Sequence, residues 1–210
     1  MIPMPSVVWY FDFISPYAYF GLHTLQRLPR GAALQYRPIL FAGLLKHWGQ
    51  KGPAEIAPKR VWTYRSCIWL ARRSQLPFQM PAAHPFNSLP FLRLAIAAGN
   101  TPEAIHTIFR SLWTTGADPA DPMMISRLAD LLAIPLHRLA ETAVKDELRA
   151  NTDLAIQSGV FGVPSFAIGE QVFWGSDALD FATAYLTQPD ILDDAEMRRA
   201  ATLPVAASRL

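Results

Sequence analysis

The stretch "YFDFISPYAYFG" (Tyr10–Gly21) places one side chain, that of Ser15, where a hydroxyl group could do chemistry. An alternating apolar run ends here, and a helical pattern starts at the proline that follows. A Ser-Pro pair is a typical helix start, because serine caps free backbone N–H groups and proline suits the first turn. The same position follows a predicted strand and opens a predicted helix, where negatively charged ligands bind. Ser15 is therefore either a simple cap or a hydrogen-bond donor to an anionic ligand.

The chain has one cysteine, Cys67, which excludes an intramolecular disulfide, a CxxC redox pair and a cysteine-rich metal site. Its neighbours in "SCIWLA" are apolar or aromatic, which favours a buried and inert thiol. Because a hydroxyl cannot exchange disulfides, Ser15 could act only by donating a hydrogen bond to the thiolate of another molecule. The histidines lack metal-site spacing, so no metal is predicted, and exposed or loop positions suffice for His23, His47, His84, His106 and His137.

Composition describes a globular protein with a sizeable core. The 210 residues are 51% hydrophobic and 17% charged, and the net charge of +2 is too small to indicate a nucleic-acid partner. The densest basic group lies on one predicted helix and indicates either a solvated face or a small-anion site: Lys59, Arg60, Arg65, Arg72 and Arg73. The N-terminus lacks a signal-peptide pattern, and no apolar run approaches the roughly 20 residues that span a bilayer. We therefore expect a cytoplasmic protein without a membrane partner.

The elements that would position Ser15 follow from hydrophobic periodicity. Val7–Phe13 and Ala33–Leu40 are predicted strands, and a helix from Pro16 to about Leu28 lies between them. This β-α-β order predicts a parallel strand pair. Later in the chain, "SFAIG" and "QVFWG" predict two strands joined by a turn at Gly169-Glu170, and a last helix is predicted to start near Ser176.

Between these parts, almost only helical periodicity is found. The predicted helices cover residues 42–48, 59–74, 89–99, 102–115, 124–132 and 136–159. Removing this block leaves β-α-β-β-α, the thioredoxin core. The predicted fold class is α/β, a thioredoxin-like fold with an inserted all-helical domain: residues 1–41 and 158–210 form the thioredoxin-like domain and residues 42–157 the insertion. No structure is assigned to the tail after Pro189.

Three fragments in the right order carry a family resemblance: "FDFISPYAYFG", "FGVPSF" and "FWGSDALDF". With "ILFAGLLKHWG" and "PAEIAPKR" between them, the chain resembles the glutathione-dependent 2-hydroxychromene-2-carboxylate isomerases from about Val7 to Leu186. That family shares a superfamily with kappa-class glutathione transferases and DsbA-type oxidoreductases. The resemblance implies a homodimer that binds glutathione and a small aromatic substrate.

The resemblance implies that Ser15 holds the glutathione sulfur as a thiolate. Val163-Pro164 resembles the cis-proline of thioredoxin folds, and the Val163 main chain would pair with the cysteinyl part of glutathione. The alternative for this pair is a plain trans turn. Trp174 and Gly175 would shape the pocket wall.

Further roles implied by the resemblance lie at the last helix and in the insertion. Ser176 and Asp177 are a cap and a first-turn acid by sequence alone. The resemblance adds binding of the γ-glutamyl group by these two residues. Lys46 and Lys59 are either surface lysines or carboxylate ligands, and Gln50 stands where similar transferases have asparagine, which weakens a glutathione contact there.

The substrate side of the implied pocket is less specific. Asn87 lies at a family position near the active site, or it caps the helix that follows. Aromatic residues are candidates for a substrate wall, although most helical aromatics belong to a core: Tyr17, Phe41, Trp48, Trp62 and Tyr64. Among these, Tyr17 and Trp62 are the predicted substrate contacts, with Lys46 and Asn87.

The activity implied is isomerisation of 2-hydroxychromene-2-carboxylate, interconverted with trans-o-hydroxybenzylidenepyruvate, or of a similar aromatic keto acid. Reversible addition of a bound thiolate would let a double bond rotate. One alternative is a kappa-like transferase, which releases a thioether. The other is a non-catalytic thioredoxin-like binding module.

Overall fold

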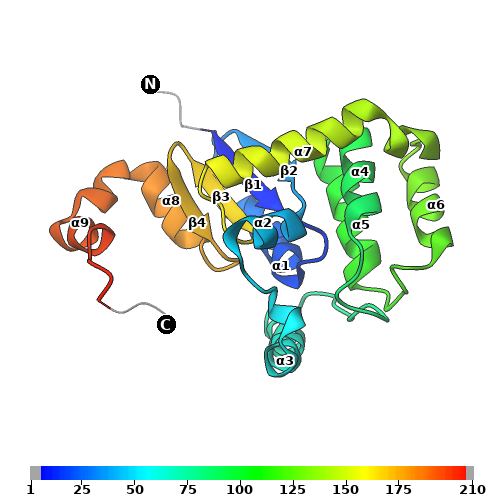
Figure 1. Cartoon of the computed structure of the whole chain (residues 1–210), viewed down its shortest axis with the longest axis horizontal. Coiled ribbons are helices and arrows are strands. Elements are labelled where there is room, and N and C mark those ends of the chain that lie inside the picture. The colour runs from blue at the N-terminus through cyan, green and yellow to red at the C-terminus, as the bar shows by residue number, and fades with distance from the viewer. Residues whose placement is uncertain (1–5, 207–210) are drawn as a thin grey trace.

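The computed structural model describes residues 6–206, so the outermost residues of the predicted thioredoxin-like segments, 1–5 and 207–210, lie outside it. A four-stranded sheet in the order β2-β1-β3-β4 lies at its centre (Figure 1). The strands are β1 (Val7–Phe11), β2 (Leu34–Pro38), β3 (Ser165–Ile168) and β4 (Gln171–Trp174). β1 pairs with β2 in parallel and with β3 antiparallel, and β3 pairs antiparallel with β4. The predicted parallel pair and the predicted hairpin are both confirmed.

Nine helices surround the sheet within the described range. They are α1 (Pro16–Thr24), α2 (Phe41–Trp48), α3 (Ala57–Arg73), α4 (Leu89–Ala97), α5 (Pro102–Trp113), α6 (Pro122–Leu131), α7 (Thr142–Gln157), α8 (Leu179–Thr187) and α9 (Ala195–Ala201). Short 3-10 turns cover Leu25–Arg27, Pro53–Glu55, Leu136–Ala140 and Pro189–Asp193. In Figure 1, α4, α5 and α6 lie on one side of the sheet and α8 and α9 on the other.

Several predicted elements differ in extent from their patterns. The helix predicted from Pro16 to about Leu28 ends at Thr24 and is followed by a 3-10 turn. The strand predicted to Phe13 stops at Phe11, because a turn closes with the Ser15 N–H donating to the Asp12 carbonyl at 3.0 Å. The helix predicted over residues 136–159 is a 3-10 turn followed by α7. Glu141 between them has extended backbone angles (φ −59°, ψ 141°), which interrupt helical hydrogen bonding.

The largest buried cluster joins β1 to the helices on its face. Phe109 of α5 contacts Trp9, Phe11 and Phe13, with ring centroids 6.3, 5.7 and 4.6 Å away. These four side chains are fully buried. Trp113, one helical turn after Phe109, donates its indole N–H to the Phe13 carbonyl at 2.9 Å. The end of β1 is therefore fixed both by packing and by a buried hydrogen bond.

The C-terminal part differs from its prediction in two respects. The last core helix, α8, begins at Leu179 rather than near Ser176, with Ala178 as its N-cap. Gly175 has a positive φ of 117°, and the Ala178 N–H donates to its carbonyl at 3.3 Å, so Ser176 and Asp177 lie in a turn. After Pro189, where no structure was assigned, the chain forms a 3-10 turn and α9, which has no buried residue.

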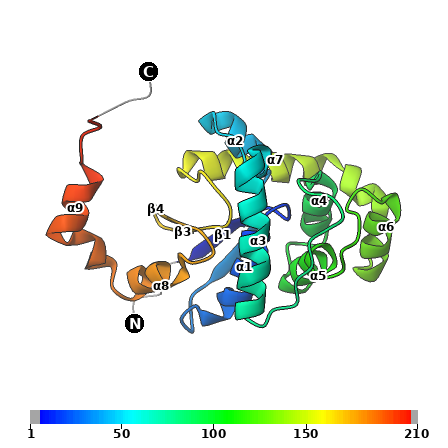
Figure 2. The same ribbon diagram turned by 90° about the horizontal axis from the view of Figure 1, so that it is seen from below.

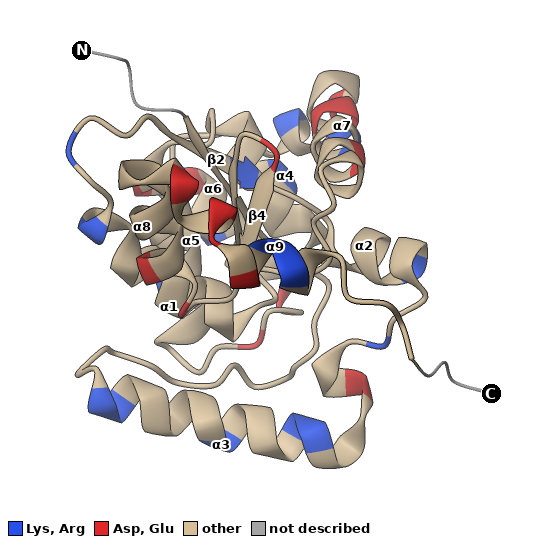
Figure 3. Ribbon diagram, turned by 90° about the vertical axis from the view of Figure 1, so that its left-hand side faces the viewer, with Lys and Arg blue, Asp and Glu red and all other residues tan. Residues whose placement is uncertain are grey.

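α3 lies at the bottom of the molecule in Figure 1 and next to α1, in front of which it crosses when seen from below (Figure 2). It buries Thr63, Cys67 and Ala71, which are spaced four residues apart and so share one helix face. Its charged side chains are all basic (Figure 3). Among residues 6–206, no helix combines the length and apolar character needed to cross a membrane.

Candidate active site

A cavity of about 580 Å³ opens at the carboxyl end of β1. Its lining comes from the turn before α1, the start of α2, the segment leading into α3, and the loops before α4 and β3. Seven of the residues predicted for a site line it: Ser15, Tyr17, Gln50, Lys59, Asn87, Val163 and Trp174. Six do not: Lys46, Trp62, Pro164, Gly175, Ser176 and Asp177. The topology thus brings residues from both ends of the chain to one cavity.

Ser15 caps α1, which confirms one of the two roles that its sequence context indicated. Its Oγ accepts the Ala18 N–H at 3.2 Å, so it caps α1. The same hydroxyl donates to the carbonyl of Val163, which also lines the cavity, at 3.3 Å. The second bond is long for an O–H donor, so a charged acceptor in the cavity would compete well for that hydrogen.

The Val163–Pro164 peptide bond is cis, as predicted. The Pro164 carbonyl accepts the Gly175 N–H at 3.0 Å, which joins the segment to the turn after β4. Pro164 also packs closely against α1: a Cβ built on Gly21 would lie 3.3 Å from its ring. These contacts hold the Val163 carbonyl opposite Ser15.

Asp12 lies in the cavity wall and was not singled out in the sequence. Its two carboxylate oxygens accept the Ile14 N–H at 3.1 Å and the Phe41 N–H at 2.9 Å. Burial raises the pKa of the Asp12 carboxyl to about 6, although these hydrogen bonds and one with Ser88 oppose the increase. An acid inside an otherwise apolar run was the signal available. Asp12 links the Ser15 turn to the first residue of α2.

The raised pKa of Asp12 predicts a pH dependence of stability. The folded state binds this proton more tightly than the unfolded state, so the group's contribution is full below pH 3.8 and is lost as pH rises through about 6. We expect the free energy of unfolding of the wild type, relative to Asp12→Asn, to fall by about 1 kcal/mol between pH 5 and pH 7.5. Urea denaturation at several pH values measures this difference.

The asparagine variant controls for other titrating groups, because the histidines are common to both proteins. It also loses one hydrogen-bond acceptor, but this cost does not depend on pH. A difference that stays constant over the range, or that grows with pH, would contradict the assignment of the raised pKa to Asp12.

His84 also lines the cavity, although exposed or loop roles were expected for all histidines. Its Nε2 lies 2.8 Å from the Ile14 carbonyl oxygen, and its Nδ1 lies 2.8 Å from the Tyr64 hydroxyl. Burial lowers the pKa of the imidazole, and the bond to Ile14 partly offsets this. His84 is therefore an ordered part of the site.

Both aromatic and basic side chains line the cavity. Phe161 and Trp174 meet edge to face, with ring centroids 5.2 Å apart. Gly162 leaves room for this pair, because a Cβ there would lie 2.3 Å from the Trp174 indole nitrogen. The exposed Lys51 and Lys59 supply positive charge at the rim. Such a cavity suits a ligand with an apolar body and a carboxylate.

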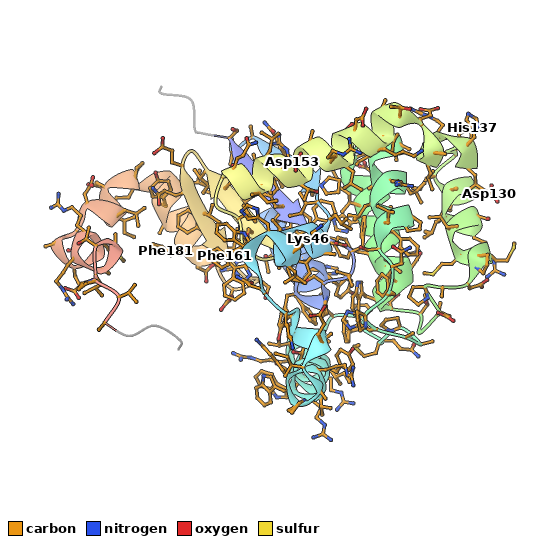
Figure 4. All side chains as sticks on the ribbon, in the orientation of Figure 1. Lys46, Asp130, His137, Asp153, Phe161 and Phe181 are labelled. Atoms are coloured by element: carbon orange, nitrogen blue, oxygen red, sulfur yellow. The ribbon has the colours of Figure 1, made fainter. Side chains whose placement is uncertain are left out.

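The remaining predicted contacts have varied surroundings. Asn87 lines the cavity and also accepts the Leu89 N–H at 3.1 Å, so both of its proposed roles have support. Gln50 is exposed at the cavity edge. Lys46 lies on the exposed side of α2, as Figure 4 shows together with Phe161 on the loop before β3. Trp62 is 69% exposed on α3.

Tyr17 connects the cavity to the buried face of α3. Burial raises the pKa of its hydroxyl, and the groups that influence this pKa include Thr63 and Cys67 of α3. Cys67 is fully buried, and this burial raises the pKa of the thiol to about 12, so the predicted inert thiol is confirmed. Within the described range, no three His, Cys, Asp or Glu side chains are placed to hold a metal ion.

Comparison with known proteins agrees with this architecture. Residues 6–187 match the family model of the DSBA-like thioredoxin domain. A 2-hydroxychromene-2-carboxylate isomerase from Sphingobium xenophagum is 30% identical over 190 residues, which cover 86% of this chain and 97% of that protein. Glutathione S-transferase kappa 2 from Caenorhabditis elegans is 29% identical over 208 residues, or 87% of this chain and 92% of the relative.

A solved structure confirms the fold. The 2-hydroxychromene-2-carboxylate isomerase structure superposes with a TM-score of 0.75 at 22% identity, covering 91% of this chain and 98% of the other. The relatives are thus isomerases and glutathione transferases. With its mixed sheet, its added helices and a family match that spans most of its length, this chain belongs to the DSBA-like thioredoxin-domain family, in the branch of the 2-hydroxychromene-2-carboxylate isomerases and kappa-class glutathione transferases.

Proposed function

We propose that this protein is a glutathione-dependent isomerase of 2-hydroxychromene-2-carboxylate, which it interconverts with trans-o-hydroxybenzylidenepyruvate, or of a similar aromatic keto acid. The observation that carries the proposal is the Ser15 hydroxyl, which lies on the cavity at the N-terminus of α1 and opposite the Val163 carbonyl. The isomerase activity and the glutathione in this proposal are taken from the names of the relatives.

The residues present fit glutathione. The cavity of about 580 Å³ lies within the usual range for small-molecule sites. Ser15 offers a hydroxyl donor, and Val163 offers main-chain groups beside the cis bond. Gln50 and Lys59 at the rim would hold a carboxylate, and Trp174 would close one wall. Ser176 and Asp177, which directly follow this wall, are proposed for the γ-glutamyl end.

When bound, glutathione supplies a thiolate that adds reversibly to an unsaturated carbon and is released unchanged. The Ser15 hydroxyl would donate a hydrogen bond to the negatively charged sulfur. The positive end of the α1 dipole, at the helix N-terminus, would favour the same charge. A decrease of one unit in a thiol pKa corresponds to about 1.4 kcal/mol in favour of the charged form. Because Ser15 is only 7% exposed, water competes little for its hydrogen bond.

On the substrate side, the aromatic pair of Phe161 and Trp174 would contact an aromatic ring. Asn87 and Tyr17 line the same cavity and would orient the substrate's polar groups. Lys46 and Trp62 are not retained as substrate contacts, because they lie outside the lining. A homodimer is part of the proposal, through the resemblance to the isomerases.

The test is turnover of 2-hydroxychromene-2-carboxylate by the purified protein, with and without glutathione, followed by absorbance and by a free-thiol assay. We expect isomerisation to require glutathione and the thiol concentration to stay constant. Thiol loss in step with substrate loss would instead support a kappa-like transferase. Absence of glutathione binding at millimolar concentration, measured by calorimetry, would support a non-catalytic binding module.

A further inference from the structure

The turn that carries Ser15 is held by a side chain from a distant part of the chain. Residues 12–15 connect β1 to α1. Within this turn, the Ile14 carbonyl lies 2.8 Å from Nε2 of His84, which belongs to the loop between α3 and α4. Seventy positions separate the two residues. A bond of this kind between two loops restrains the turn in a way that α1 alone does not.

The geometry determines which nitrogen of His84 carries the hydrogen. A carbonyl oxygen only accepts hydrogen bonds, so Nε2 is the donor toward Ile14. The Tyr64 hydroxyl donates its one hydrogen to the His84 carbonyl at 2.6 Å, and its oxygen lies 2.8 Å from Nδ1. The imidazole packs against Trp113 with ring centroids 5.6 Å apart. The ring is thus held by a hydrogen bond at Nε2 and by packing on one face.

The Ile14 carbonyl and the Ser15 N–H belong to one planar peptide unit. His84 holds the oxygen of this unit, and the Asp12 carbonyl accepts its N–H at 3.0 Å. A peptide plane bonded at both ends has little freedom to rotate. Its orientation determines where the Cα of Ser15, and therefore the hydroxyl, is placed relative to the cavity.

We propose that His84 is a positioning residue for Ser15: by donating to the Ile14 carbonyl, it fixes the peptide plane that aims the Ser15 hydroxyl at a bound thiolate. This inference rests on the proposed function. His84 acts through the backbone and takes no part in bond making. A misplacement of a reacting group by about 1 Å can lower the rate about 100-fold. Loss of the hydrogen bond from His84 to the Ile14 carbonyl should therefore have a measurable effect on kcat.

The test compares His84→Ala with His84→Gln in the full chain. The glutamine amide can place an N–H donor near the position of Nε2, whereas alanine has none. The readouts are kcat, the KM for glutathione, and the pKa of the bound thiol, obtained from the ultraviolet absorbance of its thiolate as a function of pH. His137→Ala is the matched control, because His137 is exposed on the 3-10 turn before α7 (Figure 4).

We expect His84→Ala to lower kcat about tenfold and to raise the pKa of the bound thiol, with less than about a twofold change in KM. His84→Gln should restore most of both values, and His137→Ala should match the wild type. In a Ser15→Ala background, His84→Ala should have no further effect on kcat, because the two residues act as one unit.

Three results would overturn the inference while leaving the proposed function in place. The first is an unchanged thiol pKa and kcat in His84→Ala. The second is an equal loss of kcat in the presence and absence of the Ser15 hydroxyl. The third applies if His84→Ala does not fold. In that case, a folded His84→Gln whose thiol pKa and kcat are as far from the wild-type values as those of Ser15→Ala would overturn the inference. A wild type that binds no glutathione, or that leaves its thiol pKa unchanged, overturns both proposals.

Discussion

Ser15→Ala should lower the turnover number about 100-fold while changing the glutathione dissociation constant less than threefold. Among residues 6–206, the hydroxyl hydrogen-bonds with the Ala18 N–H and the Val163 carbonyl alone, so its removal leaves the rest of the cavity in place. Because Ser15 favours the bound thiolate over the thiol, its loss lowers the reactive fraction of glutathione, whereas the other contacts to the tripeptide still hold it in the cavity. Steady-state kinetics with 2-hydroxychromene-2-carboxylate and calorimetry with glutathione measure the two quantities.

The cap on α1 is lost in the same variant, and a second variant separates this effect. Thr101 caps α5 in the same way, because its side chain accepts the Ala104 N–H at 3.3 Å, and it does not line the cavity. Thr101→Ala should therefore lose about 1 kcal/mol of stability, as Ser15→Ala does, without losing turnover. Equal losses of turnover and affinity in Ser15→Ala would assign Ser15 a structural role alone.

Phe109→Ala should destabilise the fold by about 3–5 kcal/mol. The Phe109 ring is fully buried and lies against three aromatic side chains of the β1 segment, Trp9, Phe11 and Phe13. Removing it leaves a cavity that rigid neighbouring rings cannot fill. The measurement is the midpoint of urea denaturation, followed by tryptophan fluorescence and circular dichroism.

Leu131→Ala is the control for this variant, since Leu131 is a large apolar residue that is 67% exposed on α6. Its free energy of unfolding should stay within about 0.5 kcal/mol of the wild type. A loss below about 1 kcal/mol for Phe109→Ala would show that α5 and β1 pack less tightly than described.

The sequence allowed the strands and their pairing to be predicted, because apolar runs bounded by turns limit the possible topologies. Ser15 and Val163, which are 148 positions apart, meet because the β-α-β unit and the hairpin share one sheet. The helix faces were harder to predict. α3 buries small residues, Thr63, Cys67 and Ala71, while Trp62 lies on the exposed side. The burial of Cys67 was predicted from its apolar neighbours, but Trp62, a predicted substrate contact, carries no local signal for the face that it occupies.

The roles that were missed depend on contacts between residues far apart in the chain. His84 belongs to the site because an irregular loop brings it to the Ile14 carbonyl, and no periodicity encodes such a loop. Asp12 links the Ser15 turn to α2 by accepting the N–H of Phe41, which is 29 positions away in the chain. The start of α8 was placed near Ser176 because serine is a preferred cap, but the backbone turn at Gly175 moves the first helical residue to Leu179.

The burial of Cys67 has a consequence for redox exposure. A thiol whose pKa is about 12 stays protonated at physiological pH and is a poor nucleophile. Glutathione disulfide and alkylating agents therefore find no reactive sulfur on a chain whose single cysteine is fully buried. Under the proposed function, the activity during oxidative stress would follow the supply of reduced glutathione, and the polypeptide itself would escape S-glutathionylation.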